Sequence, residues 1–235
     1  MPALAALPGV GPVFDQAWSA YRLRAPLLLG LLAAWALTWV ALEVLVVSSG
    51  RRPGDPIWVI LHLLYFWATA YWEAAIAGCA LDHFAGRPPA PRRYLGNHRL
   101  VRHVLVLKIV LIPAILLGVA LLLVPGIVLT ARLGLAFYAS VDRRCGPRAA
   151  LAFAWGRTRG HSPGLARLVL ALGAFNVAGA ALLGLGLLLT VPMTALAGAY
   201  TFHAVSEDGN PDRTPPLHEA PGVPPHGATS EPITP

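Results

Sequence analysis

Long apolar segments dominate the chain, and short polar connections, most of them basic, separate these segments. The apolar segments are residues 27–47, 57–81, 104–124, 127–141 and 165–205. An α-helix rises about 1.5 Å per residue, so about 20 apolar residues cross the hydrocarbon core of a bilayer. The last segment is roughly twice that length, and we expect it to fold back on itself near residues 184–186. The pattern therefore predicts an all-α integral membrane bundle of six transmembrane helices.

The composition supports a membrane environment. Hydrophobic residues make up 56% of the 235 residues, charged residues make up 12%, and the mean hydropathy is +0.62. Soluble domains are about 25% charged, so a soluble chain of this size could not bury this much apolar surface. The net charge of +7 does not imply a nucleic-acid partner, because membrane proteins gather Arg and Lys in cytoplasmic loops.

Basic residues divide unequally between the two sides of a six-span arrangement. If both termini lie on one side, the opposite side receives only Arg51 and Arg52, and 14 arginines gather on the side of the termini. The positive-inside rule then places both termini in the cytoplasm. A five-span alternative would treat residues 165–205 as one helix. The length of this segment argues against that alternative more strongly than the distribution of basic residues does.

Each predicted hairpin follows a short segment that resembles an interfacial helix. These segments are residues 13–24, 92–103 and 147–161. In the first, Trp18 lies on one helical face with two other aromatic residues and is close to Arg22; in the third, Leu151 and Trp155 repeat the spacing. A basic helix with aromatic residues on its apolar face can lie in the membrane interface and contact anionic lipid headgroups. We therefore predict three hairpins, each preceded by a short cytoplasmic interfacial helix.

Three regions follow from this pattern. Residues 1–26 form a cytoplasmic N-terminal segment, and residues 27–205 form the transmembrane domain. Residues 206–235 are rich in proline and acidic residues and poor in large apolar ones, so we expect a disordered cytoplasmic tail. The tail is either a solvated extension or an extended ligand for a protein partner.

Four ionisable side chains fall inside the predicted spans, where exposure to lipid would cost about 2.5–3.5 kcal/mol each. Their depths, counted from the span ends at ~1.5 Å per residue, suggest two ion pairs. Glu43 and Arg132 are expected to pair near the outer side, and Glu73 and Lys108 near the inner side. We interpret these pairs as structural contacts that fix helix register; the alternative is an ion or proton path.

The segment LLLVPGIVLTARLGLAF, residues 121–137, contains Pro125 and Gly126 between two apolar segments. Pro and Gly are the strongest punctuators of regular structure. We predict that these two residues form the outer turn of a tight hairpin between the third and fourth spans.

Motifs that would indicate catalysis or metal binding are missing from the sequence, which contains no G-x-S-x-G, Walker loop, H-E-x-x-H or C-x-x-C. Cys79 and His83 share a helical face, with Asp82 between them and His98 and His103 in the following loop. A zinc site needs three or four convergent ligands, and nothing in the spacing enforces that convergence. We expect no metal, no cofactor and no catalytic residues. The two cysteines, Cys79 and Cys145, are predicted to face the reducing cytoplasm and to remain thiols.

Residues 124–160, VPGIVLTARLGLAFYASVDRRCGPRAALAFAWGRTRG, resemble a signature of bacterial polytopic membrane proteins. This set includes the membrane domain that accompanies some glycerophosphodiester phosphodiesterases and the YciC-type inner-membrane proteins. The sequence departs from the signature at Ala154, where Ser is usual, and at Tyr138, where Pro is common. The residues at matching places are Pro125, Gly126, Arg132, Ala150, Leu151, Trp155, Thr158, Arg159 and Gly160.

The resemblance implies a multi-pass bacterial membrane protein without an assigned activity, and no segment here is long enough to hold the phosphodiesterase domain. We expect a non-enzymatic protein with a structural or partner-binding role in the bacterial envelope. The alternative is a component of a small-solute or lipid transporter or channel, and a lipid phosphodiester activity ranks third.

Overall fold

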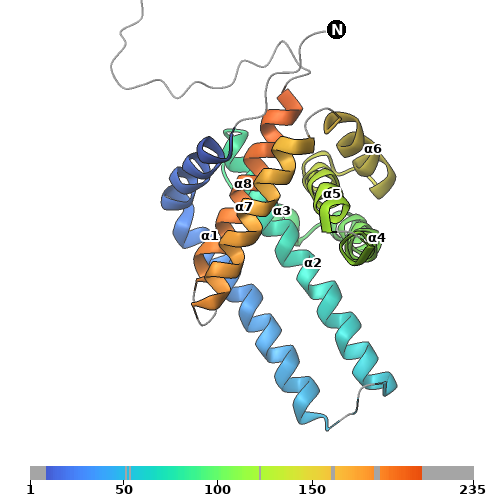
Figure 1. Ribbon diagram of the computed structural model, residues 1–235. Coiled ribbons are helices and arrows are strands. Elements are labelled where there is room, and N and C mark those ends of the chain that lie inside the picture. The colour runs from blue at the N-terminus through green and yellow to red at the C-terminus, as the bar shows by residue number, and fades with distance from the viewer. Residues whose placement is uncertain are drawn as a thin grey trace, which may run out of the picture.

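In the computed structural model, the described residues form eight α-helices and no strand. The described residues are 9–50, 52, 54–121, 123–159, 162–182 and 186–207. The predicted tail lies almost entirely outside them. The helices are α1 Val10–Ser48, α2 Pro56–Phe84, α3 Pro91–Leu95, α4 His98–Leu121, α5 Leu123–Arg143, α6 Pro147–Arg157, α7 Ser162–Ala181 and α8 Leu187–Glu207 (Figure 1).

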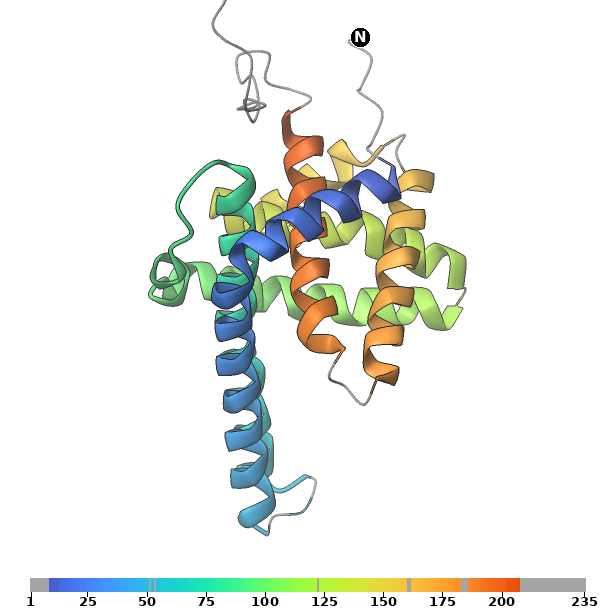
Figure 2. The same ribbon diagram turned by 90° about the vertical axis from the view of Figure 1, so that its left-hand side faces the viewer.

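The first interfacial segment and the first apolar segment form one helix. α1 is 39 residues long and contains Pro26, which lies between the two segments. A proline inside a helix removes one backbone hydrogen bond and clashes with the preceding turn, so it bends the helix. Figure 2 shows α1 changing direction between its dark-blue N-terminal part and the rest. The prediction of a separate short helix at 13–24 is therefore wrong, because Pro26 bends α1 without ending it.

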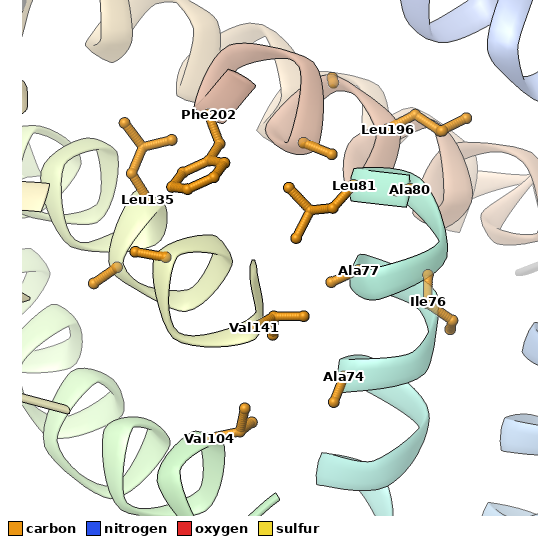
Figure 3. Packing of buried hydrophobic residues seen from close by; sticks show 14 of the residues in the cluster. Ala74, Ile76, Ala77, Ala80, Leu81, Val104, Leu135, Val141, Leu196 and Phe202 are labelled. Atoms are coloured by element: carbon orange, nitrogen blue, oxygen red, sulfur yellow. The ribbon is translucent and has the colours of Figure 1, made fainter. Parts of the chain in front are cut away.

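α2 is the central helix of the bundle. Residues 74–82 are all buried, and most of them are alanine, glycine or cysteine. Small side chains let neighbouring helices approach closely, and α1, α3, α4, α5 and α8 all pack against α2. Figure 3 shows Ala74, Ala77 and Leu81 of α2 turned toward side chains of the neighbouring helices, among them Val141 and Phe202.

The helices run in more than two directions. α7 and α8 run alongside each other, as do α2 and the longer part of α1, and Figure 1 shows these two pairs inclined to each other. α4 and α5 cross both pairs, as Figure 2 shows. α4 and α5 pack side by side, and α6 packs against α5. Helices that cross make contact at one place and separate on either side of it, so this arrangement opens space between α5 and the α7–α8 pair.

The connection between α4 and α5 lies earlier than predicted. α4 ends at Leu121 and α5 begins at Leu123, so Pro125 and Gly126 lie in the first turn of α5 and do not form the turn itself. The first four N–H groups of a helix have no carbonyl partner within the helix. A proline at the third position therefore costs no hydrogen bond, and the helix starts before the Pro-Gly pair.

The long segment 165–205 divides where its length suggested. α7 ends at Ala181 and α8 begins at Leu187. The backbone of Gly186 lies so close to Gly179 that a Cβ on Gly186 would lie 2.5 Å from the Gly179 carbonyl oxygen. Glycine at these positions is what lets the two helices approach at this end.

The second interfacial segment divides in two. α3 covers Pro91–Leu95, and α4 begins at His98, where the Asn97 side chain accepts a hydrogen bond from the Leu100 N–H at 3.0 Å. An asparagine that caps the first turn of a helix separates the two elements. The third interfacial segment forms one short helix, α6, as expected.

Among the residues that the structure describes, five helices, α1, α2, α4, α7 and α8, are long and apolar enough to cross a membrane, and α5, which covers the predicted fourth span, is not one of them. The chain thus has the helical content and the apolar helices of a membrane protein.

Candidate functional site: a groove among α2, α5, α7 and α8

Two neighbouring cavities lie beside α8 in the described part of the bundle. The first has a volume of about 310 Å³ and lies between α5, α7 and α8. The second has a volume of about 320 Å³ and lies between α2, α5 and α8. Both cavities are lined by Tyr138, Asn176 and Thr194, so these three residues form the partition between them. We call the two cavities together the groove.

The lining of the first cavity follows from helical spacing. Thr130, Gly134 and Tyr138 lie at every fourth position of α5, and Thr194, Gly198 and Thr201 lie on one face of α8. Side chains at these spacings share one face of a helix, so each helix presents a stripe of small or hydroxylated residues. From α7 the cavity receives apolar side chains and one amide, contributed by Leu165, Leu168, Val169, Leu172, Gly173 and Asn176.

Hydrogen bonds hold the partition in place. Asn176 Nδ2 donates to Thr194 Oγ1 at 2.7 Å and to the Leu172 carbonyl at 2.8 Å. Tyr138 donates its hydroxyl hydrogen to the Ala195 carbonyl at 3.2 Å. The Tyr138 ring lies against Gly198, where a Cβ would overlap the ring. The partition therefore connects α5, α7 and α8 through contacts made inside an apolar bundle.

The sequence analysis noted Tyr138 only as a departure from the signature and did not assign any of the three residues to a site, although a signal was available for Asn176 and Thr194. Asn176 and Thr194 lie at equal distances in sequence from residue 185, where the segment 165–205 was predicted to fold back. The two arms of a helical hairpin bring such residues to the same level. The sequence therefore contains a polar pair placed symmetrically about the predicted turn, and this pair could have been identified from the sequence alone.

The second cavity ends at an ion pair that the sequence predicted. Lys108 Nζ on α4 donates to Glu73 Oε1 on α2 at 2.8 Å, and it also donates to Thr69 Oγ1 at 3.3 Å. The ammonium group lies 4.9 Å from the centroid of the Phe66 ring. Phe66, Thr69 and Glu73 recur at helical spacing on α2, so one face of α2 surrounds the charge. The Glu73 side chain is 38% exposed and also lines the second cavity, whereas Lys108 is 14% exposed.

The predicted outer pair, Glu43 with Arg132, is not formed. Glu43 lies between α1 and α2 beside Leu61, His62 and Tyr65, in the part of these helices that extends away from α4 and α5 (Figure 2). Arg132 lies on α5 with its guanidinium carbon 5.0 Å from the centroid of the Trp155 ring.

The prediction failed because depth along separate spans does not fix which helices touch. After α5 ends at Arg143, α6 packs back against α5. Arg132 lies about 16 Å before the end of α5, and Trp155 lies about 12 Å after the start of α6, at ~1.5 Å per residue. The return of the chain therefore brings these two side chains to the same level.

The other residues of the predicted interfacial motif lie along α1 and α6. Trp18 is exposed and stacks with Tyr21, and the Arg22 guanidinium carbon lies 5.9 Å from the centroid of the Trp18 ring. Leu151 packs against the core, and Thr158 is buried and donates to the Ala154 carbonyl at 2.8 Å. Arg159 is exposed, and Gly160 lies outside the described residues.

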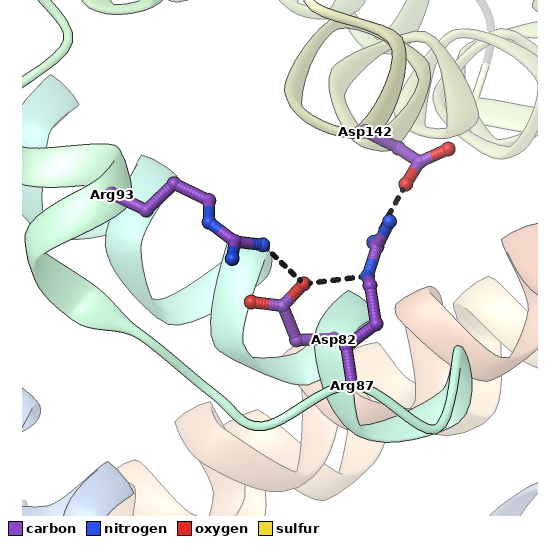
Figure 4. Close-up of polar contacts among 4 residues, drawn as sticks. All are labelled: Asp82, Arg87, Arg93 and Asp142. Atoms are coloured by element: carbon purple, nitrogen blue, oxygen red, sulfur yellow. Dashed lines mark hydrogen bonds and ion pairs between the residues drawn. The ribbon is translucent and has the colours of Figure 1, made fainter.

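A buried carboxylate that the sequence analysis considered only as a metal ligand anchors the C-terminal end of α2. Asp82 is 0% exposed, and its Oδ1 lies 2.9 Å from Arg87 Nε and 3.7 Å from Arg93 Nη1 (Figure 4). Arg87 Nη2 also lies 3.2 Å from Asp142 Oδ1 at the end of α5. Burial lowers the pKa of Arg87, but the carboxylates of Asp142 and Asp82 more than offset that effect and leave it raised.

This cluster has a structural character. Two arginines neutralise Asp82, and the ion pairs join the ends of α2, α3 and α5. Burial and the nearby Asp82 carboxylate raise the pKa of the Tyr94 hydroxyl, whose ring packs against Gly78. The available signal in the sequence was an aspartate in the last turn of an apolar helix.

The residues considered for metal binding do not gather into a site. Among the residues that the structure describes, no group of three or more His, Cys, Asp or Glu side chains could hold a metal ion. Cys79 is a buried free thiol, and His98 Nδ1 lies 2.6 Å from the Tyr71 hydroxyl. Asp82 is engaged by arginines, as described above.

No protein-family model matches the chain. No curated protein and no solved structure matches it either. The resemblance to bacterial polytopic membrane proteins therefore stays a prediction.

Proposed function

We propose that this chain is a non-enzymatic, multi-pass protein of the bacterial cytoplasmic membrane that binds an apolar chain from the membrane in the groove. The observation that carries the proposal is the sharing of Tyr138, Asn176 and Thr194 by two cavities of about 310 and 320 Å³. Ligand pockets have volumes of roughly 300–1,000 Å³, and they are mostly apolar with a few placed polar groups. The groove has this size and this composition.

The partner of the predicted partner-binding role is, in this proposal, a membrane lipid. α7 contributes Leu165, Leu168 and Leu172 to the groove, and these side chains would contact a hydrocarbon chain. A lipid in the surrounding bilayer reaches such a site without first passing through water. The arginine-rich connections on the cytoplasmic side would bind anionic headgroups near the same membrane.

The proposal includes six spans with both termini in the cytoplasm. α1 with α2, α4 with α5, and α7 with α8 would each leave the cytoplasmic side and return to it. Because each pair returns the chain to its starting side, the location of the termini does not depend on how deeply α4 and α5 enter the membrane.

Photolabelling in liposomes tests the proposed binding. The probe is a 12-carbon alkane with a diazirine, present as a trace component, and mass spectrometry locates the labelled residues. We expect labelling to concentrate on the groove faces of α7 and α8, near Leu168 and Ala195, and to exceed labelling of the exposed residues Leu37 and Val177. Equal labelling of all exposed apolar helix faces would contradict the proposal, because that pattern describes an ordinary lipid-facing surface.

A second candidate function is a role in transport of a solute or lipid, and the Glu73–Lys108 pair at the end of the groove favours it. Ionisable groups inside membrane proteins commonly mark substrate or ion paths. Uptake of a solute by liposomes that contain the purified protein, lost in Glu73→Gln, would support this role. Liposomes with protein but without any uptake above protein-free controls would leave binding as the better account.

A further inference from the structure

The hydroxyl hydrogens that line the groove are already used. Thr130 donates to the Gly126 carbonyl at 2.8 Å, and Thr194 donates to the Thr190 carbonyl at 2.8 Å. Thr201 donates to the Ala197 carbonyl at 2.7 Å. Each of these bonds runs back along the threonine's own helix, and Tyr138 donates to Ala195 of α8. A ligand in the groove therefore finds hydroxyl oxygens whose hydrogens point away from it.

Asn176 leaves one acceptor in the groove. Both hydrogens of its side-chain amide are donated, one to the Leu172 carbonyl and one to Thr194 Oγ1. A carbonyl oxygen accepts and never donates, so the nitrogen of the amide must face Leu172, and this contact fixes the orientation of the side chain. Among the residues that the structure describes, Asn176 Oδ1 has no hydrogen-bond donor, and this oxygen is an acceptor.

The ion pair leaves a second acceptor and no net charge. Lys108 donates hydrogen bonds to Glu73 and Thr69, and its ammonium group also lies 4.9 Å from the centroid of the Phe66 ring. Glu73 uses Oε1 for Lys108, and its side chain borders the second cavity beside Asn176. The pair is neutral as a whole, so the groove offers acceptors without an excess of negative charge.

From this inventory we infer that the groove takes an uncharged amphiphile whose polar end is a hydrogen-bond donor, such as the hydroxyl of a long-chain alcohol or an acylglycerol. The hydroxyl lies in the second cavity and donates to Asn176 Oδ1 or to Glu73, and the chain lies in the first cavity. The inference rests on the proposed binding of an apolar chain and names the chemistry of its polar end.

The same inventory disfavours charged ligands. An anionic headgroup would find no free donor and would lie beside the Glu73 carboxylate. A cationic headgroup would add a charge next to a pair that is already neutral, and an unpaired charge in an apolar bundle is costly. A plain alkane would leave Asn176 Oδ1 without a donor.

Competition against the photolabel of the previous subsection tests the inference on the unaltered protein. The competitors are 1-dodecanol, dodecane, dodecylamine and dodecanoate, compared at equal mole fraction in the bilayer. We expect dodecanol to displace the probe at a mole fraction about tenfold lower than dodecane, the factor that one or two net hydrogen bonds supply. Dodecylamine and dodecanoate should displace it less well than dodecanol. Stronger displacement by either charged compound, or equal displacement by dodecanol and dodecane, would overturn the inference.

Two variants separate this inference from the proposal on which it rests. Asn176→Leu removes the free acceptor and should reduce the preference for dodecanol over dodecane while the probe still labels the groove. Thr158→Val is the control, because it removes a hydroxyl that lies outside the groove and donates to the Ala154 carbonyl, and it should keep the preference. If wild-type labelling is not concentrated in the groove, the proposed function fails; if labelling is concentrated there and the alcohol has no advantage, only the inference fails.

Discussion

Asn176 Nδ2 lies 2.7 Å from Thr194 Oγ1, and this contact joins the two arms of the α7–α8 pair inside the partition of the groove. The two residues are 18 positions apart in sequence and come from helices that were expected from one long apolar segment. Because the contact joins two helices in a partly buried place, its loss should weaken the packing of α7 on α8 and alter the groove on both sides.

Replacing Thr194 with valine should destabilise the bundle. Thr194→Val keeps the shape of the side chain and removes the hydroxyl that accepts from Asn176, so the expected loss in free energy of unfolding is about 1 kcal/mol. Unfolding of the purified protein in mixed micelles by increasing SDS measures it. Thr130→Val is the control, since its hydroxyl bonds within α5; an equal loss in both variants would argue against an interhelical role for Thr194.

The Glu73–Lys108 pair predicts a non-additive result. Glu73→Gln leaves the ammonium of Lys108 without its counter-charge, and Lys108→Met leaves the carboxylate without its partner. Each single variant should lose about 2 kcal/mol, less than a fully buried pair because Glu73 is 38% exposed. The double variant should lose less than the sum, as measured by SDS unfolding. Additive losses would show that the two residues do not interact energetically.

The position of Arg132 predicts that charge swapping with Glu43 has no compensating effect. Glu43→Arg combined with Arg132→Glu should give no higher folded yield than the worse single variant, because the two side chains lie on different parts of the bundle. Fluorescence-detected size exclusion of the expressed variants measures this yield. A higher folded yield in the double variant than in either single variant would contradict this prediction. It would support the outer Glu43–Arg132 pair that depth along the sequence suggested.

The raised pKa of Tyr94 predicts a loss of stability in alkaline solution. The ordinary value is 10.0, and burial followed by the Asp82 carboxylate raises the pKa in the folded chain. Above pH 10 the unfolded chain releases the phenolic proton while the folded chain still holds it, so stability falls as pH rises toward the folded-state pKa. In Tyr94→Phe, the stability measured by thermal unfolding should decrease less steeply between pH 9 and pH 11. The difference in slope should correspond to roughly one proton released on unfolding. The same slope in both proteins would show that Tyr94 is not the group responsible.

Sequence patterns predicted the parts of this structure that depend on neighbouring residues. Apolar length located the helices and the division of 165–205, because hydrophobic burial and helical rise act along the chain. The pairing of Glu73 with Lys108 also followed, since the two residues lie at similar distances from the connection between α2 and α4, which pack together.

The groove and the position of Arg132 depend on the directions of the helices, which local patterns do not encode. α4 and α5 cross the other helices, α6 returns along α5, and Pro26 bends α1 without ending it. These features decide which side chains meet, so depth counted along isolated spans placed Arg132 beside the wrong partner. The cavities arise where crossing helices separate, and they have no periodic signature.

Filling the first cavity tests the central claim, that the groove binds an apolar chain, most directly. Gly134 and Gly173 both line this cavity, and a Cβ at either position would meet no atom within 4 Å, so a larger side chain there begins in open space. Gly30 on α1 has the same open surroundings outside the groove and serves as the matched control. The measurement is the amount of diazirine alkane bound per protein at saturation. Gly134→Leu with Gly173→Leu should lose most of the groove labelling while Gly30→Leu keeps it; undiminished labelling in the filled variant would contradict the account.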